Sequence, residues 1–312
     1  MDSIINNGYP LDLLEILVVD GQSTDGTREI VKQYEKKCSA VKYIENPKRI
    51  LASAWNIGIK NGKGDIIMAL NAHGVFRKGY ISSCIEHLNK YDADYVGGII
   101  VTLPRQDVFL DKAVVTVLSH PFGVGNSYFR IGLNKARWAD TAAFGGYRKK
   151  IFQKTGLFNE ELARSQDMEF HLRLKRAGCK ILLAPDMICD YYIRSNFRDF
   201  VRDSFVNGYW TLYPLKFAKI AISWRHLVPF IFVFSLLGSA ILSTLFPLFG
   251  WLFMVILCSY LLVNIYFSQK IAGSKRDIRL FFIIPLLFTI LHIGYGMGAM
   301  YAGIKVLVSK MF

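Results

Sequence analysis

Paired cysteines are missing from this sequence. Its five cysteines are odd in number and scattered without a paired spacing, at positions 38, 84, 179, 189 and 258. This pattern indicates neither a disulfide framework nor a zinc site, so we expect reduced thiols in the core. Internal repeats and low-complexity segments are missing as well, which excludes a repeat architecture and a compositionally biased chain.

Charged side chains are missing from a long stretch of the C-terminal third. Residues 228–267 contain none, and Phe-Pro-Leu-Phe-Gly at 246–250 divides the stretch in two. Because about 20 apolar residues cross a bilayer as a helix, there is room for two spans. A third apolar run has glycines and Pro285, which would also suit a re-entrant segment. We predict three helices in a membrane domain of residues 228–308, at 228–246, 249–267 and 280–301.

Acidic residues are scarce beside these apolar runs. From Ser204 onward, nine lysines and arginines accompany a single carboxylate, Asp277, and the whole chain carries a net charge of +14. Membrane lipid headgroups explain this excess better than nucleic acid, which we do not expect as a partner. Basic residues precede the first span and follow the second. By the positive-inside rule we predict a multi-pass protein of the cell membrane with a cytoplasmic N-terminal domain, and no signal peptide contradicts this.

Strands and helices alternate in the N-terminal region. Three short runs rich in β-branched residues, at 15–20, 41–44 and 65–70, are each followed by a helical pattern, at 27–37, 52–60 and 80–91. This alternation predicts an α/β fold with a mostly parallel sheet, and Ser23 or Thr24 would cap the first helix. Ligands of such sheets bind beyond the carboxyl ends of the strands. Residues 104–138 look irregular, and we expect a long functional loop there rather than core.

Four segments carry clustered polar residues and glycines. They are Val-Asp-Gly-Gln-Ser-Thr-Asp-Gly-Thr at 19–27, Leu-Asn-Ala-His-Gly at 70–74, Ser-His-Pro-Phe-Gly-Val-Gly at 119–125, and Gly-Gly-Tyr-Arg at 145–148 followed by Ser-Gln-Asp-Met-Glu-Phe-His-Leu-Arg at 165–173. In this order they resemble the family 2 glycosyltransferases, in particular the branch typified by the succinoglycan-biosynthesis glucosyltransferase. The resemblance implies a Rossmann-like GT-A catalytic domain over residues 1–210, followed by transmembrane helices.

The same resemblance implies an activity. A nucleotide-diphosphate sugar, expected to be a UDP-sugar, would donate a hexose to a lipid-linked saccharide acceptor with inversion, in exopolysaccharide or cell-surface glycan synthesis. Residues 207–210 lack the Gln-x-x-Arg-Trp motif of processive synthases, which favours addition of a single sugar. Residues 211–227 are predicted as an amphipathic interfacial segment. Within it, residues 216–225, basic with interleaved apolar side chains, predict an interfacial helix that would bring the site to the acceptor.

The first segment would bind the nucleotide. Asp20 ends a strand and can accept a hydrogen bond from a pyrimidine N–H, while Gly21 lets the backbone approach the ligand. We place Ser23 and Asp25 in the same donor site. The alternative is an ordinary turn aspartate, with Asp25 near a helix N-terminus.

Residues 71–73 stand where the resemblance implies an Asp-x-Asp motif that holds the ribose and a divalent ion. No carboxylate is present there. Asn71 can still bond a ribose hydroxyl, and His73 can ligate a metal ion, with Mn²⁺ suited better than Mg²⁺. The succinoglycan branch has Asp-Ala-His at this place, so His73 fits and Asn71 departs from the pattern. The alternative is a structural histidine.

Asp167 matches the aspartate that the family uses as general base, with Gln166 in place of the more usual glutamate. It would take the proton of the acceptor hydroxyl, and it gains basicity when partly desolvated. The alternative is that Asp167 and Glu169 only favour a helix start. Arg148 is available to bind the departing diphosphate, as are Arg164, Lys48 and Arg49, although such side chains are usually just solvated.

A second function competes with catalysis. The family's domain normally begins with a strand and a helix, and this chain starts inside that helix. Loss of the strand would open the sheet and remove part of the donor pocket. The competing reading is a catalytically silent, truncated membrane relative that acts as a binding or scaffolding protein. A transporter is disfavoured, because the spans offer no Asp, Glu, Lys or Arg to a polar solute.

Overall fold

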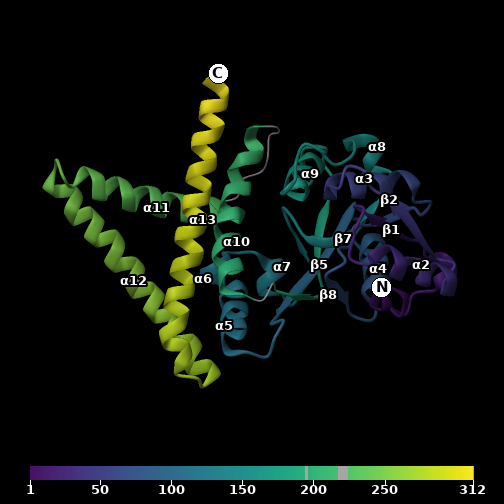
Figure 1. Ribbon diagram of the computed structural model, residues 1–312, viewed down its shortest axis with the longest axis horizontal. Helices are drawn as coiled ribbons and strands as arrows, with labels where there is room; N and C mark the ends of the chain where they lie inside the picture. The colour runs from purple at the N-terminus through teal and green to yellow at the C-terminus, as the bar shows by residue number, and fades with distance from the viewer. Residues whose placement is uncertain (194–195, 217–223, 312) are drawn as a thin grey trace. The chain divides into compact units, whose positions relative to one another are not determined.

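The computed structural model describes residues 1–193, 196–216 and 224–311, and Figure 1 labels its elements. By their contacts these residues form two compact units. The first unit contains Met1–Val101 and Gly132–Tyr191, and the second contains Thr102–Ile131 and the described chain from Tyr192 onward. Parts of the predicted 1–210 domain, residues 102–131 and 192–210, therefore belong to the second unit.

The first unit opens with short helical turns, α1 (Asp2–Ile5) and η1 (Leu11–Leu13), and continues with a strand-helix-strand motif. Strand β1 (Ile16–Asp20) leads through α2 (Thr27–Lys37) to β2 (Val41–Glu45). The two strands pair in parallel, from Ile16 beside Val41 to Asp20 beside Glu45. The prediction of this motif is confirmed, and it places the ends of β1 and β2 side by side.

A second sheet in this unit has the order β3-β7-β5-β8-β4, with β6 paired to β8. Its strands are β3 (Ile66–Met68), β4 (Gly74–Phe76), β5 (Tyr95–Leu103), β6 (Arg137–Trp138), β7 (Ala143–Arg148) and β8 (Ile181–Tyr192). The pairs β3–β7, β5–β7, β4–β8 and β6–β8 are antiparallel. The α/β class is confirmed. The parallel pairing is that of β1 with β2. The second sheet differs because β7 and β8, which follow the alternating region in the sequence, form these antiparallel pairs.

Five longer helical segments complete the first unit, and those at the predicted places agree with the expected ranges to within about a residue. They are α2, α3 (Leu51–Asn61), α4 (Tyr80–Lys90), α8 (Ile151–Thr155) and α9 (Gln166–Arg176). Two cysteines, Cys84 and Cys189, are buried together in the core, as expected. Burial raises the pKa of the Cys84 thiol to about 12, which keeps it protonated and inert. Cys258 is exposed, so the expectation of core thiols is wrong for that residue.

The second unit is helical. Its elements are α5 (Phe109–Leu118), α6 (Pro121–Val124), α7 (Tyr128–Ile131), α10 (Phe197–Leu212), η2 (Tyr213–Lys216), α11 (Trp224–Leu242), α12 (Pro247–Lys275) and α13 (Arg279–Met311). Three of them, α11, α12 and α13, are long and apolar enough to cross a membrane, by length and composition. The predicted number of three is confirmed. Residues 217–223 of the predicted interfacial helix lie outside the described residues.

The segment 104–138 is not the irregular loop that we expected. Helix α5 buries Ala113, Val114 and Val117 in one hydrophobic cluster with Ile284 and Leu287 of α13. Their spacing of one, three and four residues puts these side chains on one face of a helix. The prediction of a loop outside the core is therefore wrong, and the Ser-His-Pro-Phe-Gly-Val-Gly segment leads on from a core helix.

A polar cluster of the second unit holds that segment against α12 and α13. The ring of His292 bonds the carbonyl oxygen of Phe122 through Nε2 at 2.8 Å and the hydroxyl of Tyr260 through Nδ1 at 3.1 Å. Asn264 donates to the Pro285 carbonyl oxygen at 3.0 Å. Helix α13 runs unbroken through Pro285, so this run is a continuous helix rather than a re-entrant segment.

Glycines bring the backbones of α10 and α13 into contact. A Cβ atom at Gly208 would lie 1.9 Å from the carbonyl oxygen of Tyr295, and one at Gly298 would lie 2.0 Å from that of Phe205. Real Cβ atoms do not approach this closely, so larger residues would force the helices apart. The glycines that interrupt the third apolar run thus serve helix packing.

We predict that Gly298→Ala lowers the stability of the second unit by about 2 kcal/mol, because the methyl group overpacks a contact between two backbones. The matched control is Gly273→Ala on α12, where a Cβ atom meets nothing within 4 Å; alanine favours the helix there by about 1 kcal/mol. Thermal unfolding of the full chain in detergent measures both. Equal midpoints for the two variants would contradict the contact.

Candidate active site

Asp20 lies at the carboxyl end of β1 with its carboxylate largely engaged. Its two oxygens accept hydrogen bonds from the backbone N–H of Ser23 at 3.0 Å, the Ser23 hydroxyl at 2.5 Å and the Tyr43 hydroxyl at 3.1 Å. Burial by itself would raise the pKa of Asp20, but these bonds outweigh it and lower the pKa. Asp20 is therefore a fixed anion at the end of the strand, beside Gly21.

The turn after Asp20 is closed differently from the prediction. Asp25 accepts hydrogen bonds from the backbone N–H and the hydroxyl of Thr27, at 3.2 and 2.6 Å. The N-cap position of α2 is Gly26, with no side-chain cap. The expected cap by Ser23 or Thr24 is wrong, because the Ser23 hydroxyl bonds Asp20 instead. The segment still holds two carboxylates, the buried Asp20 at the end of β1 and the exposed Asp25 in the turn that follows.

A side-chain pair that the sequence did not reveal joins the loops after β1 and β2. The Nε and Nη2 atoms of Arg49 donate to Oε1 of Gln22 at 3.0 and 2.6 Å. Both residues have a positive φ, of 57° and 60°. Non-glycine residues in this region store strain, which concentrates at functional sites. No local pattern could indicate this pair, because its members are 27 positions apart.

Asn71 and His73 lie in the short turn between β3 and β4. The backbone N–H of Gly74 donates to the Asn71 carbonyl oxygen at 3.2 Å, and the exposed His73 ring meets the edge of the Tyr191 ring at 5.1 Å. Within residues 1–193, 196–216 and 224–311, no group of three or more His, Cys, Asp or Glu could hold a metal ion. A divalent ion at His73 would therefore need most of its ligands from a bound molecule rather than from such side chains.

Arg148 lies away from Asn71. In the β3–β7 pair, Arg148 is opposite Ile66, at the start of β3, whereas Asn71 follows the end of that strand. The guanidinium donates to the carbonyl oxygens of Ala93 and Leu88, at 3.0 and 2.8 Å. It closes the C-terminal end of α4, where helix carbonyls lack partners.

Asp167 stands in the first turn of α9, two residues after a strained residue at the N-cap. Ser165 has a φ of 62°, and one oxygen of Asp167 accepts the backbone N–H of Met168 at 2.9 Å. The side chain is partly exposed, but burial of the carboxyl raises its pKa, and backbone hydrogen bonds offset only part of that rise. In turn the Asp167 charge adds to burial in raising the pKa values of Tyr95 and Tyr147.

Gln166 is buried beside Asp167, with 4% of its surface exposed. Its side-chain oxygen Oε1 has no hydrogen-bond partner in the described part of the chain. Leaving a buried acceptor unpaired costs about 1–3 kcal/mol. Such a cost is tolerated where a ligand supplies the missing donor, which makes Gln166 a candidate substrate contact.

His171, one turn after Asp167, joins α9 to strand β7 and to the residues before it. Its Nδ1 bonds the Thr141 hydroxyl at 2.8 Å and its Nε2 bonds the Tyr147 hydroxyl on β7 at 3.1 Å. Burial lowers the pKa of His171 to about 3, so the ring is neutral. Residues four apart share a helix face. The network thus locks the face of α9 that carries Asp167 onto the sheet.

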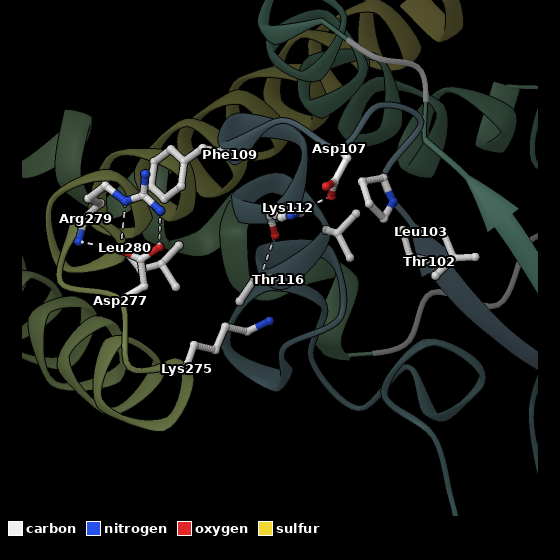
Figure 2. A pocket seen from close by; sticks show the side chains of 12 residues that line it. Thr102, Leu103, Asp107, Phe109, Lys112, Thr116, Lys275, Asp277, Arg279 and Leu280 are labelled. Atoms are coloured by element: carbon white, nitrogen blue, oxygen red, sulfur yellow. Dashed lines mark hydrogen bonds and ion pairs between the residues drawn. The ribbon is translucent and has the colours of Figure 1, made fainter.

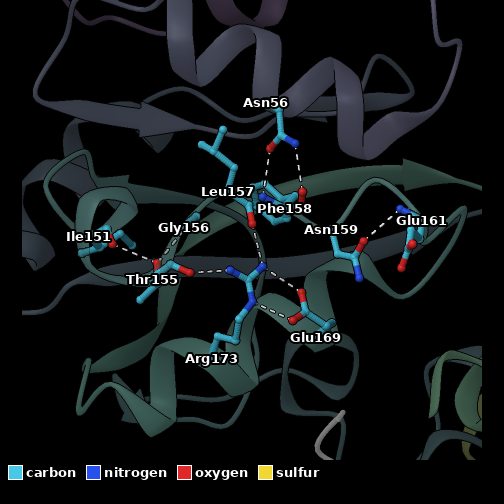
Figure 3. A network of polar contacts seen from close by, with 10 residues as sticks. All are labelled: Asn56, Ile151, Thr155, Gly156, Leu157, Phe158, Asn159, Glu161, Glu169 and Arg173. Atoms are coloured by element: carbon cyan, nitrogen blue, oxygen red, sulfur yellow. Dashed lines mark hydrogen bonds and ion pairs between the residues drawn. The ribbon is translucent and has the colours of Figure 1, made fainter. Parts of the chain in front are cut away.

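Figure 3 shows a second brace at Arg173 of the same helix. Its guanidinium points between Glu169, which it contacts at 2.6 and 2.8 Å, and the carbonyl oxygens of Thr155 and Leu157, at 2.5 and 2.7 Å. Asn56 of α3 adds two hydrogen bonds of 2.9 Å to the backbone of Phe158. The loop that leads into α9 is therefore held on both sides.

Comparison with known proteins identifies the class. Residues 1–156 match the model of glycosyl transferase family 2. A Methanococcus voltae protein, named dolichyl N-acetyl-alpha-D-glucosaminyl phosphate 3-beta-D-2,3-diacetamido-2,3-dideoxy-beta-D-glucuronosyltransferase, is 28% identical over 306 residues, which cover 95% of this chain and 90% of that protein. The succinoglycan biosynthesis protein ExoA of Rhizobium meliloti (strain 1021) is 27% identical over 241 residues, covering 69% and 71%.

The chain belongs to glycosyl transferase family 2 and is a glycosyltransferase. Its fold is similar to that of the mannosyltransferase PcManGT from Pyrobaculum calidifontis, solved in complex with GDP-Man and Mn²⁺. The TM-score is 0.53 at 16% identity, over 99% of this chain and 82% of that one. A GT-A domain with apolar C-terminal helices, as the resemblance implied, is thereby confirmed.

We predict that Arg173→Met lowers the stability of the first unit by about 3 kcal/mol, because it leaves the buried Glu169 carboxylate without its partner. The matched control is Arg176→Met on the same helix. Urea-induced unfolding of the full chain in detergent gives the free energy of unfolding of both variants. If Arg176→Met costs as much as Arg173→Met, the brace is not the cause.

We also predict a pH dependence from His171. Its pKa is about 3 in the folded chain and about 6.5 unfolded. Below pH 6.5 the unfolded chain binds a proton that the folded chain refuses, so stability is lost as the pH falls from 6.5 towards 3, by up to about 1.4 kcal/mol per pH unit. Between pH 7.5 and 5.5, the thermal midpoint of His171→Gln should fall less than that of the wild type. Parallel falls would refute a neutral buried ring.

Proposed function

We propose that this glycosyltransferase moves a hexose from a nucleotide-diphosphate sugar, a UDP-sugar, to a lipid-linked saccharide in cell-surface glycan or exopolysaccharide synthesis. The observation that carries the proposal is the partly desolvated Asp167 on a helix braced at His171 and Arg173. The names of two relatives support it, one for transfer to a dolichyl-phosphate-linked sugar and one for succinoglycan biosynthesis.

In this reaction Asp167 acts as general base. It removes the proton of the acceptor hydroxyl while that oxygen forms a bond to the anomeric carbon, and the bond from that carbon to the diphosphate breaks on the opposite face. The configuration inverts, the nucleoside diphosphate leaves with the electron pair, and Asp167 keeps the proton. Burial raises the pKa of Asp167, and a raised pKa makes the ionised carboxylate a stronger base.

The donor would lie at the ends of β1 and β3. Asp20, with Gly21, Ser23 and Asp25 around it, is proposed for the nucleotide, and Asn71 for the ribose. Gln166 would accept a hydrogen bond from bound substrate through its unpaired oxygen. Arg148 is not placed at the diphosphate, because its donors close the end of α4.

His73 is proposed as the protein ligand of a divalent ion, Mn²⁺ before Mg²⁺, shared with the donor diphosphate. When bound, such an ion would offset the negative charge of the leaving diphosphate. The PcManGT structure contains Mn²⁺, which supports the proposal by analogy of fold.

The three apolar helices support a membrane anchor with the catalytic unit in the cytoplasm. Lysine and arginine residues flank α11 at its start and α12 at its end. The positive-inside rule assigns these two helix ends to the cytoplasmic face of the membrane. Nucleotide sugars would then reach the donor site from the cytosol, and membrane lipid would present the acceptor.

We predict that Asp167→Asn lowers kcat for UDP-sugar transfer to a lipid-linked acceptor by about 10²–10⁴-fold, the range that a general base contributes. The amide is nearly isosteric but cannot take the proton. The matched control is Glu161→Gln, an exposed carboxylate of the preceding loop, which should keep full activity. The full chain in detergent with Mn²⁺ is the sample.

Two other outcomes would overturn the proposal. Full activity of Asp167→Asn would remove this residue as the base. A folded wild-type chain that neither turns over nor binds any nucleotide sugar would favour the silent binding or scaffolding protein.

A further inference from the structure

The second unit contains a pocket that the proposed reaction does not use. It has a volume of about 540 Å³ and is formed by the end of β5, by α5 and by the turn between α12 and α13 (Figure 2). Three basic side chains line it, Lys112, Lys275 and Arg279. Phe109 and Leu280 add an apolar wall. A volume of this size suits a ligand rather than a few water molecules.

The charged side chains that line the pocket have a net positive charge. Arg279 is held by Asp277 at 2.8 Å and lies over the Phe109 ring at 4.6 Å, and Lys112 pairs with Asp107 at 2.5 Å. Lys275 has no ion pair among the residues that the structure describes. Three cations therefore accompany two carboxylates, both of which already have a partner. The ligand that this arrangement attracts is an anion.

The position of the pocket in the membrane helices specifies the kind of anion. Lys275 is the last residue of α12 and Arg279 is the first of α13, and both helices are apolar enough to cross a membrane. The turn between them, visible in Figure 1, is thus at the level of the lipid headgroups. Basic pockets at the ends of membrane helices bind phosphate-bearing headgroups.

We propose that this pocket binds the phosphate headgroup of an anionic membrane phospholipid. Lys112, Lys275 and Arg279 contact the phosphate, and Phe109 and Leu280 face the apolar part of the same molecule. This mixture of cations and apolar surface favours a lipid over free phosphate. The site lies wholly in the second unit, so its occupation is independent of the glycosyl donor and of Asp167.

Native mass spectrometry of the full chain in a nonionic detergent tests the proposal, with phosphatidylglycerol and phosphatidylcholine as equimolar probes. We expect one phosphatidylglycerol per chain, bound about ten-fold more tightly than phosphatidylcholine. Lys275→Gln and Lys112→Gln should each weaken phosphatidylglycerol binding at least about five-fold. The matched control is Lys270→Gln, an exposed lysine of α12 outside the pocket, which should stay within about two-fold of the wild type.

Three results would overturn the proposal. Equal binding of the two lipids would show that the pocket does not distinguish an anionic headgroup from a zwitterionic one. An equal loss in Lys270→Gln and Lys275→Gln would show a diffuse surface attraction instead of a site. Displacement of phosphatidylglycerol by inorganic phosphate at the same concentration would show that the ligand is free phosphate. Unchanged thermal midpoints of the variants confirm that they are folded.

Discussion

The docking of α9 onto β7 is the constraint on which the catalytic unit depends. A carboxylate can serve as base only where the protein holds it against the substrate, and a short helix following a loop has little stability by itself. Here a neutral His171 joins the helix to Tyr147, and the Arg173–Glu169 pair ties it to the loop before it. The brace residues Glu169, His171 and Arg173 lie two, four and six residues after Asp167, so they fix its position without binding its carboxylate.

The second unit depends on a different interaction, the close approach of backbones. Small residues let helix backbones approach closely, and polar contacts between the helices add to their packing. Gly208 and Gly298 permit the contact of α10 with α13, and His292 with Asn264 supplies the polar part. Helices α12 and α13, which carry His292 and Asn264, also carry the basic turn at Lys275 and Arg279. One packing arrangement thereby supports both the three apolar helices and the proposed lipid site.

Local patterns in the sequence predicted the strand-helix motif after Ile16, the three apolar helices and the family, because each rests on spacing along the chain. Tertiary pairings could not be predicted in this way. Arg148 looked available for a diphosphate until its bonds to the end of α4 were known, and Arg49 bonds a glutamine 27 positions away. The same holds for α5, whose core face points to residues beyond position 280. The roles of Asp20, Asn71, His73, Gln166 and Asp167 stay predictions.

The pH dependence of kcat/KM for sugar transfer tests the central claim most directly. If Asp167 is the base and burial raises its pKa, activity must fall as the pH is lowered through one ionisation clearly above the ordinary aspartate value of about 3.9. The residual activity of Asp167→Asn must lack that acidic limb. A wild-type profile that stays flat down to pH 4, or an acidic limb unchanged in Asp167→Asn, would contradict the account.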